Sequence, residues 1–202
     1  DADSQVGLSV LYSIGLGVPK NQQTATKWVS LAAKQGHRLA QYNLGISYEM
    51  GEGVQQNRKT ALKWFTKAAE QGLDIAQYEM AIRFVAGNGM PQDLKAAFKW
   101  FMLAAEQGHD QAQANLGLMY NNGDGVLENH KTAVKWYIKA AEQGNALGQV
   151  RLGYMYHNGM GVQENHKAAV KWYTAAAKQG DASAQGYLGV MHAIGAGVLT
   201  DT

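Results

Sequence analysis

The apolar and polar positions of this 202-residue chain recur with a period of 36 residues. A tryptophan and a Gln-Gly pair keep this step throughout; the residues are Trp28, Trp64, Trp100, Trp136 and Trp172, and Gly36, Gly72, Gly108, Gly144 and Gly180. A fixed period of this length is typical of repeat architectures. The pattern predicts a single solenoid over 1–202, with five full units at 4–39, 40–75, 76–111, 112–147 and 148–183, and a half unit at 184–202.

Each unit begins with a stretch that has helical spacing of apolar residues, here called helix A. In residues 112–123, Leu116, Tyr120 and Gly123 stand at i, i+4 and i+7, which predicts one buried stripe. Gly117 lies near that stripe, and because a glycine inside a helix costs ~1 kcal/mol relative to alanine, we expect a neighbouring helix to approach closely there. Other units repeat this feature with Gly45, Gly153, Gly189 and the small substitute Ala81. A G-x-G pair, as at Gly123, is expected to end helix A.

A second helical stretch, helix B, follows a residue type that caps helix N-termini; these residues are Asn21, Asn57, Asp93, Asn129 and Asn165. Within 131–144, Ala133, Trp136, Ala140 and Ala141 predict a buried face, and the lysines fall largely on the other side. One helix pair cannot bury its stripe alone, whereas stacked pairs can. Alternation typical of strands is never long enough to predict a sheet. The predicted fold class is an all-α solenoid of helix-turn-helix repeats.

The repeat A-x-x-x-L-G-x-x-Y-x-x-G-x-G-V-x-x-N-x-K-x-A-x-x-W-Y-x-x-A-A-x-x-G resembles that of the Sel-1-like repeat family, a relative of the tetratricopeptide repeat. The fourth unit matches at Leu116, Gly117, Tyr120, Gly123, Gly125, Val126, Asn129, Lys131, Ala133, Trp136, Tyr137, Ala140, Ala141 and Gly144. The resemblance covers nearly the whole chain and implies a right-handed superhelix, an adaptor role between proteins and a bacterial source. Local departures are Ser9, Ala81, Met90 and His192. Cysteine-rich members staple their repeats with disulfides, but this chain has no cysteine.

Some helix A positions vary between units while the scaffold positions hardly change. The third, seventh and tenth residues of each unit cluster on one side of the helical wheel, away from the Leu/Tyr stripe. By analogy with tetratricopeptide arrays, this side is expected to line a concave, partner-binding groove. The candidate residues are Tyr42, Ile46, Glu49, Tyr78, Ile82, Val85, Leu118, Asn121, Tyr154 and His157, together with Ala114 and Val150. The alternative is that these side chains only fill the inner wall of a tightly wound superhelix.

Charge and composition argue against several classes of partner. The net charge is +2 and lysines alternate with acids, so no basic face for nucleic acid is predicted. No apolar run approaches the ~20 residues of a membrane-spanning helix, so no membrane insertion is expected. The absence of cysteine leaves the compartment open between periplasmic or secreted and cytoplasmic.

No catalytic, cofactor or metal site is predicted. The G-x-G pairs follow helices and recur at turns, unlike a dinucleotide fingerprint. His130 and His166 stand one repeat apart, too far to share a metal ion, and His157 is a lone histidine. His37 and His109 follow the ends of B helices, where a partial positive charge suits the helix dipole. Acids such as Glu70 are spread along the array, so the chain is predicted not to be an enzyme.

The last half unit, 184–202, has an apolar helix A and no helix B after it. We therefore expect that the parent chain continues or that this uncapped C-terminal end associates with a partner or a second copy. The predicted function is a non-enzymatic scaffold that binds a partner peptide or helix in the concave groove. An alternative is a cell-envelope factor for peptidoglycan-type ligands, which would need a polar pocket of clustered acids or hydroxyls, and the sequence indicates none.

Overall fold

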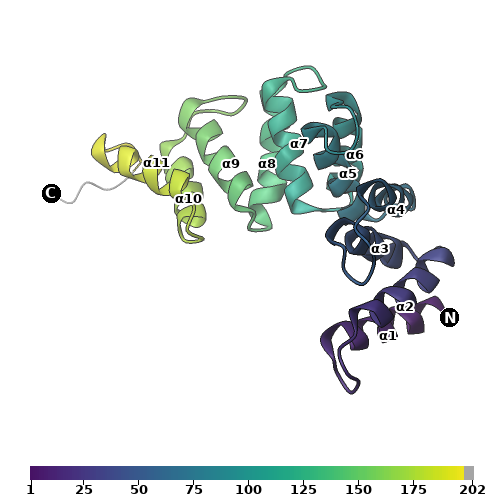
Figure 1. The fold of residues 1–202 in the computed structure, drawn as a ribbon. Helices are drawn as coiled ribbons and strands as arrows, with labels where there is room; N and C mark the ends of the chain where they lie inside the picture. Colours follow the sequence, from purple (N-terminus) through teal and green to yellow (C-terminus); the bar gives the residue numbers. More distant parts are fainter. Residues whose placement is uncertain (198–202) are drawn as a thin grey trace. The chain divides into compact units, whose positions relative to one another are not determined.

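The computed structural model describes residues 1–197, which form eleven helices and no strand (Figure 1). Two compact units, Asp1–Gln92 and Asp93–Thr202, divide the chain. The A helices are α1 (Ala2–Ile14), α3 (Arg38–Met50), α5 (Asp74–Ala86), α7 (Asp110–Asn122), α9 (Ala146–Asn158) and α11 (Ala182–Ala193). The B helices are α2 (Gln22–Lys34), α4 (Arg58–Glu70), α6 (Leu94–Glu106), α8 (His130–Glu142) and α10 (His166–Ala177). The last part of the predicted half unit, 198–202, lies outside the described residues.

Helices pack against their neighbours in chain order within each unit. In the second unit, α7 packs against α8 and α8 packs against α9, as Figure 1 shows. In the first unit, α3 packs against both α2 and α4. The predicted all-α solenoid is therefore confirmed. No helix of the described residues is long and apolar enough to cross a membrane.

The predicted helix ends are confirmed. Each predicted capping residue accepts a hydrogen bond from a main-chain N–H of the first turn; for Asn129 the donor is Thr132 N at 2.9 Å. Helix α7 ends at Gly123, whose φ of 76° is a left-handed conformation that favours glycine. Local side-chain chemistry thus sets the start of each B helix and the end of each A helix.

The sequence predicted that His37 and His109 interact favourably with the ends of the B helices that precede them. The structure gives them another role. They are the N-cap residues of α3 and α7, and their Nδ1 atoms accept hydrogen bonds from Ala40 N at 3.1 Å and Ala112 N at 3.2 Å. Each ring nitrogen thus satisfies a main-chain N–H of the first helical turn, as a capping side chain does.

The core of each repeat is centred on the residue after the tryptophan. Tyr137 is fully buried, whereas Trp136 is half-buried with the Lys139 ammonium 4.2 Å from its ring centroid. The predicted buried stripe of helix A needs a similar correction. Leu116 and Met119 are buried, whereas Tyr120, which was predicted to be buried, is only half-buried.

The helix A glycines allow close approach of the buried aromatic ring. A Cβ atom at Gly117 would lie 2.6 Å from the Tyr137 ring, and Gly45 and Gly153 have the same relation to Phe65 and Tyr173. The prediction is confirmed at these three positions. It is wrong at Gly189, where no neighbouring atom lies within 4 Å of the added Cβ.

Buried glutamines link successive helices by hydrogen bonds. Gln113 of α7 donates from Nε2 to the Ala105 carbonyl at 3.1 Å, at the end of the preceding B helix. Its Oε1 accepts from Gln143 Nε2 at 2.8 Å, at the end of the following B helix. Gln41 makes equivalent bonds in the first unit, to the Ala33 carbonyl and from Gln71. Each such glutamine therefore bonds to the two B helices that flank its own helix.

Candidate functional site

The variable positions of the A helices form the candidate site, here called the A face. In the first unit it consists of Tyr42, Ile46 and Glu49 on α3, and Tyr78, Ile82 and Val85 on α5. Most of these side chains are half-buried, whereas Val85 is exposed. Partner binding at these residues stays a prediction.

An ion-pair cluster that the sequence analysis missed lies on the A face of the first unit. Arg83 Nη2 lies 2.9 and 2.8 Å from the two carboxylate oxygens of Glu49, and 2.8 Å from Glu79 Oε1. Its guanidinium also lies 4.6 Å from the centroid of the Phe65 ring, within the range of a cation–π interaction. The side chain of Arg83 is only 11% exposed. Arg83 stands where α7, α9 and α11 carry a methionine, and that break in the repeat was the available signal.

The cluster also sets the electrostatics of its surroundings. Burial raises the pKa of Glu79, the nearby Glu49 carboxylate raises it further, and Arg83 opposes both effects. Burial and the charge of Glu79 likewise raise the pKa of Tyr42, whose ring centroid lies 5.5 Å from that of Phe65. Tyr42 is thus partly a packing residue, so a partner would reach only its outer edge.

The A face of the second unit consists of Leu118 and Asn121 on α7 and Tyr154 and His157 on α9, all half-buried. The other two candidates there, Ala114 and Val150, are buried and offer no surface to a partner.

Two of these residues contact neighbouring rings. Tyr154 lies 6.2 Å from Tyr187, measured between ring centroids. His157 is not the lone histidine of the sequence analysis, because its ring lies 5.2 Å from that of His166 on α10. The contact joins the end of one helix to the start of the next, which sequence spacing did not indicate.

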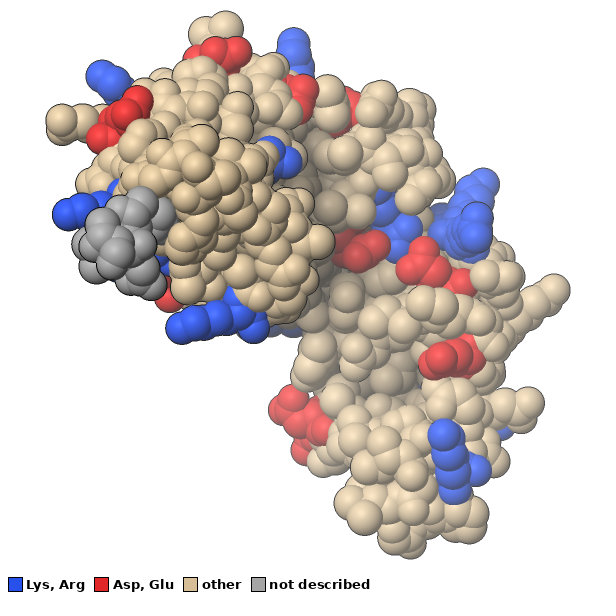
Figure 2. Space-filling model, turned by 90° about the vertical axis from the view of Figure 1, so that its left-hand side faces the viewer, with Lys and Arg blue, Asp and Glu red and all other residues tan. Residues whose placement is uncertain are grey.

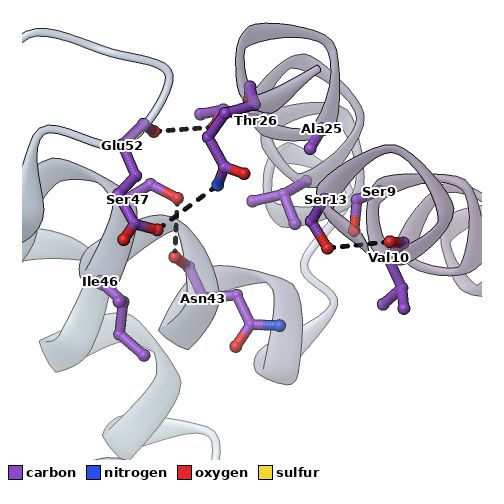
Figure 3. A pocket seen from close by; sticks show the side chains of 11 residues that line it. Ser9, Val10, Ser13, Ala25, Thr26, Asn43, Ile46, Ser47 and Glu52 are labelled. Carbon is purple, nitrogen blue, oxygen red and sulfur yellow. Dashed lines mark hydrogen bonds between the residues drawn. The ribbon is translucent and has the colours of Figure 1, made fainter. Parts of the chain in front are cut away.

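A hollow of about 230 Å³ opens between α1, α2 and α3, here called the α1–α3 hollow (Figure 3). It is lined by Ser9, Val10, Ser13, Gln22, Ala25, Thr26, Val29, Asn43, Ile46, Ser47 and Glu52. The sequence pattern indicated no pocket with clustered hydroxyls, and that prediction was wrong. Ile46 belongs to the A face, and Val10 and Ser13 stand at the equivalent positions of α1, so the hollow borders that face.

The α1–α3 hollow exists because residues smaller than those of later repeats lie next to one another on neighbouring helices. Val29 and Ser47 stand where the fourth and fifth repeats place Tyr137 and Met155, both fully buried. Ser9 stands where those repeats place a glycine that faces the aromatic ring. Because the first repeat has Val29 in place of that ring, the larger serine side chain fits there.

Charged side chains are dispersed on the face of the molecule that Figure 2 shows. On the face drawn in Figure 2, acidic and basic side chains are interspersed among uncharged ones, without an extended patch of one sign. Among the residues that the structure describes, no three histidine, aspartate or glutamate side chains gather in a way that could hold a metal ion.

Comparison with known proteins assigns the repeat to a family. A sequence profile of the Sel1 repeat matches residues 2–37, 38–73, 74–109, 110–145, 146–181 and 182–202. The chain belongs to the Sel1 repeat family. Sel1 repeats generally serve as scaffolds for protein–protein interaction, and their fold is typically non-catalytic. A search of curated proteins found no match.

Solved structures of Sel1 repeat proteins are similar to this chain. A protective antigen of uropathogenic Escherichia coli with an SLR fold is 41% identical over 100% of this chain, with a TM-score of 0.93. A Sel1 repeat protein from Oxalobacter formigenes is 38% identical over 95% of this chain and 79% of its own length, with a TM-score of 0.88. Cysteine-rich protein B of Helicobacter pylori is 28% identical over 66% of this chain and 96% of its own, with a TM-score of 0.52. This chain spans 43% of the length of the E. coli antigen.

Proposed function

We propose that this Sel1 repeat protein is a non-enzymatic scaffold whose A face binds a peptide or helix of a partner protein. The observation that carries the proposal is a contrast between two positions of helix A. One position is buried and apolar in every repeat compared, with Leu44, Met80, Leu116 and Leu152. The position two residues later varies and remains partly accessible, with Ile46, Ile82, Leu118 and Tyr154. Burial explains the first position, whereas the second keeps side-chain surface that a partner could contact.

The physical basis of binding would be preorganisation. The apolar side chains of Ile82 and Val85 are presented by a helix already held by its neighbours, so little conformational entropy is lost on binding. Aromatic residues such as Tyr42 and Tyr78 belong to the types enriched at the centres of protein interfaces.

Site-specific photo-crosslinking tests this proposal. A benzoylphenylalanine at Val85, which is 36% exposed on the A face, is compared with one at Leu103, which is 45% exposed on helix B α6. We expect a discrete partner to crosslink in cells from Val85 and not from Leu103. Crosslinking from Leu103 alone would contradict the proposal and direct the search to the B helices.

The captured partner is then purified and its affinity measured by calorimetry. We expect Ile82→Lys/Val85→Lys to weaken binding, because two apolar contacts are replaced by charges, whereas Leu103→Lys should leave the affinity unchanged. Circular dichroism must show equal helicity for the variants. Equal affinity of all of them would refute binding at the A face of α5.

A further inference from the structure

We infer that the α1–α3 hollow receives an arginine side chain of the partner segment. The inference rests on the proposed function and goes beyond it, because it names the chemistry of the residue that the A face selects.

The size and walls of the hollow suit an arginine stem. Its volume is about 230 Å³, whereas a cavity of ~150 Å³ already holds a benzene molecule. Val10, Val29 and Ile46 supply apolar lining on three helices. An arginine buries its methylene groups along such a surface while its guanidinium stays near polar groups.

The four hydroxyls of the hollow can act as acceptors toward a ligand. The hydroxyls of Ser9, Ser13, Ser47 and Thr26 all lie between 2.7 and 3.2 Å from main-chain carbonyl oxygens of their own helices, so their protons are engaged there. What these hydroxyls still offer to a ligand is lone pairs. A guanidinium carries five N–H donors and no acceptor, which complements such a lining.

The charge of the hollow has the matching sign. Glu52 is the one charged residue among those that line it, and no lysine or arginine does so. Its described partner is the neutral amide of Gln22, at a long 3.4 Å from Glu52 Oε2. A guanidinium would therefore meet a carboxylate that has no cationic partner among the described salt bridges.

A titration of the full 202-residue chain, followed by NMR of its backbone amides, tests the inference. The probe is N-acetyl-L-arginine methylamide; the citrulline analogue keeps the shape and removes the charge, and the lysine analogue keeps the charge without the planar fork. We expect saturable shifts at Ser13, Asn43, Ser47 and Glu52 with arginine. Because a hydrogen bond to a charged group is stronger than a neutral one, citrulline should bind ~10-fold more weakly.

Variants separate binding from a mere packing defect. Ser47→Met introduces the residue type of the fifth repeat and should abolish the shifts by filling the hollow, and Glu52→Gln should weaken binding ~10-fold. Glu70→Gln, at an exposed position outside the lining, is the matched control and should change nothing. If Ser47→Met only raises stability and the wild type shows no saturable shifts, the hollow is a packing defect and the inference fails.

The remaining outcomes also decide. Equal binding of arginine and citrulline, preference for lysine, or shifts with N-acetylglucosamine in place of arginine would each overturn the inference. A partner crosslinked at Val85 that binds Ser47→Met with unchanged affinity would leave the proposed function standing and reject the arginine site. Saturable arginine binding without any crosslinked partner would support the site and argue against the proposed function.

Discussion

Gly117→Ala tests how the repeats achieve their close helix packing. The added Cβ would lie 2.6 Å from Cδ1 and Cε1 of Tyr137, closer than such atoms can approach. Tyr137 is fully buried, so its ring has no free space into which it can move. Overpacking of a core costs ~1–3 kcal/mol, and the better helix propensity of alanine returns ~1 kcal/mol. The net effect on unfolding free energy should lie between ~0 and ~2 kcal/mol of destabilisation.

Gly189→Ala is the matched control for this prediction. It makes the same chemical change inside helix α11, but no neighbouring atom lies within 4 Å of the new Cβ. Only the propensity term then applies, so the variant should be stabilised by up to ~1 kcal/mol. The difference between the two variants isolates the overpacking term, which we expect to be ~1–3 kcal/mol.

Urea unfolding followed by far-ultraviolet circular dichroism measures both variants. The Gly117→Ala change is then repeated in a Tyr137→Val background, where the ring that causes the clash is absent. We expect the penalty to disappear there, which gives a coupling free energy between the two sites of ~1–3 kcal/mol. If Gly117→Ala stabilises the protein as much as Gly189→Ala does, or if the two changes are additive, the close-approach argument is wrong.

Three further results are expected. Arg83→Met should destabilise by ~1–3 kcal/mol in urea unfolding because it leaves two carboxylates without their cation, whereas Glu49→Asn/Glu79→Asn/Arg83→Met should restore most of the loss; equal stability of the single variant and the wild type would contradict this. Tyr137→Phe should raise the free energy of unfolding by ~1 kcal/mol, and with it the thermal midpoint, because the buried hydroxyl has no hydrogen-bond partner. A lower midpoint would show that the hydroxyl does have a partner. The pKa of Glu79 is raised above 4.5 on folding, so its contribution to stability is present below pH 4.5 and is lost as pH rises through the folded-state pKa. The stability of the wild type relative to Glu79→Gln should therefore fall in urea unfolding as the pH rises above 4.5, and a constant difference would refute the shift.

The repeat scaffold was predictable because its signals are local. An asparagine such as Asn129 caps the helix that begins at the next residue, and Gly123 ends the helix that precedes it. Both act through the main chain within a few residues, so no knowledge of tertiary packing is needed.

The assignment of core residues was less predictable. Trp136 and Tyr137 are adjacent and both large, and only the packing of α7 and α9 against α8 decides which of them is enclosed. Arg83 was overlooked because its partners come from two helices, and Glu49 lies 34 residues away in the chain. The α1–α3 hollow was also missed, since small residues on three helices create it only when they converge.

The glutamines that bond to flanking B helices have a consequence for how the array unfolds. When the B helix that holds Ala105 detaches, the buried amide of Gln113 loses its acceptor, and the cost falls on the next repeat. When the following B helix detaches, Gln113 loses the bond from Gln143 instead. Nearest-neighbour terms of this kind make the loss of one repeat promote the loss of the next. Repeats joined in this way should unfold in cooperative groups, with partly folded species that end at a group boundary.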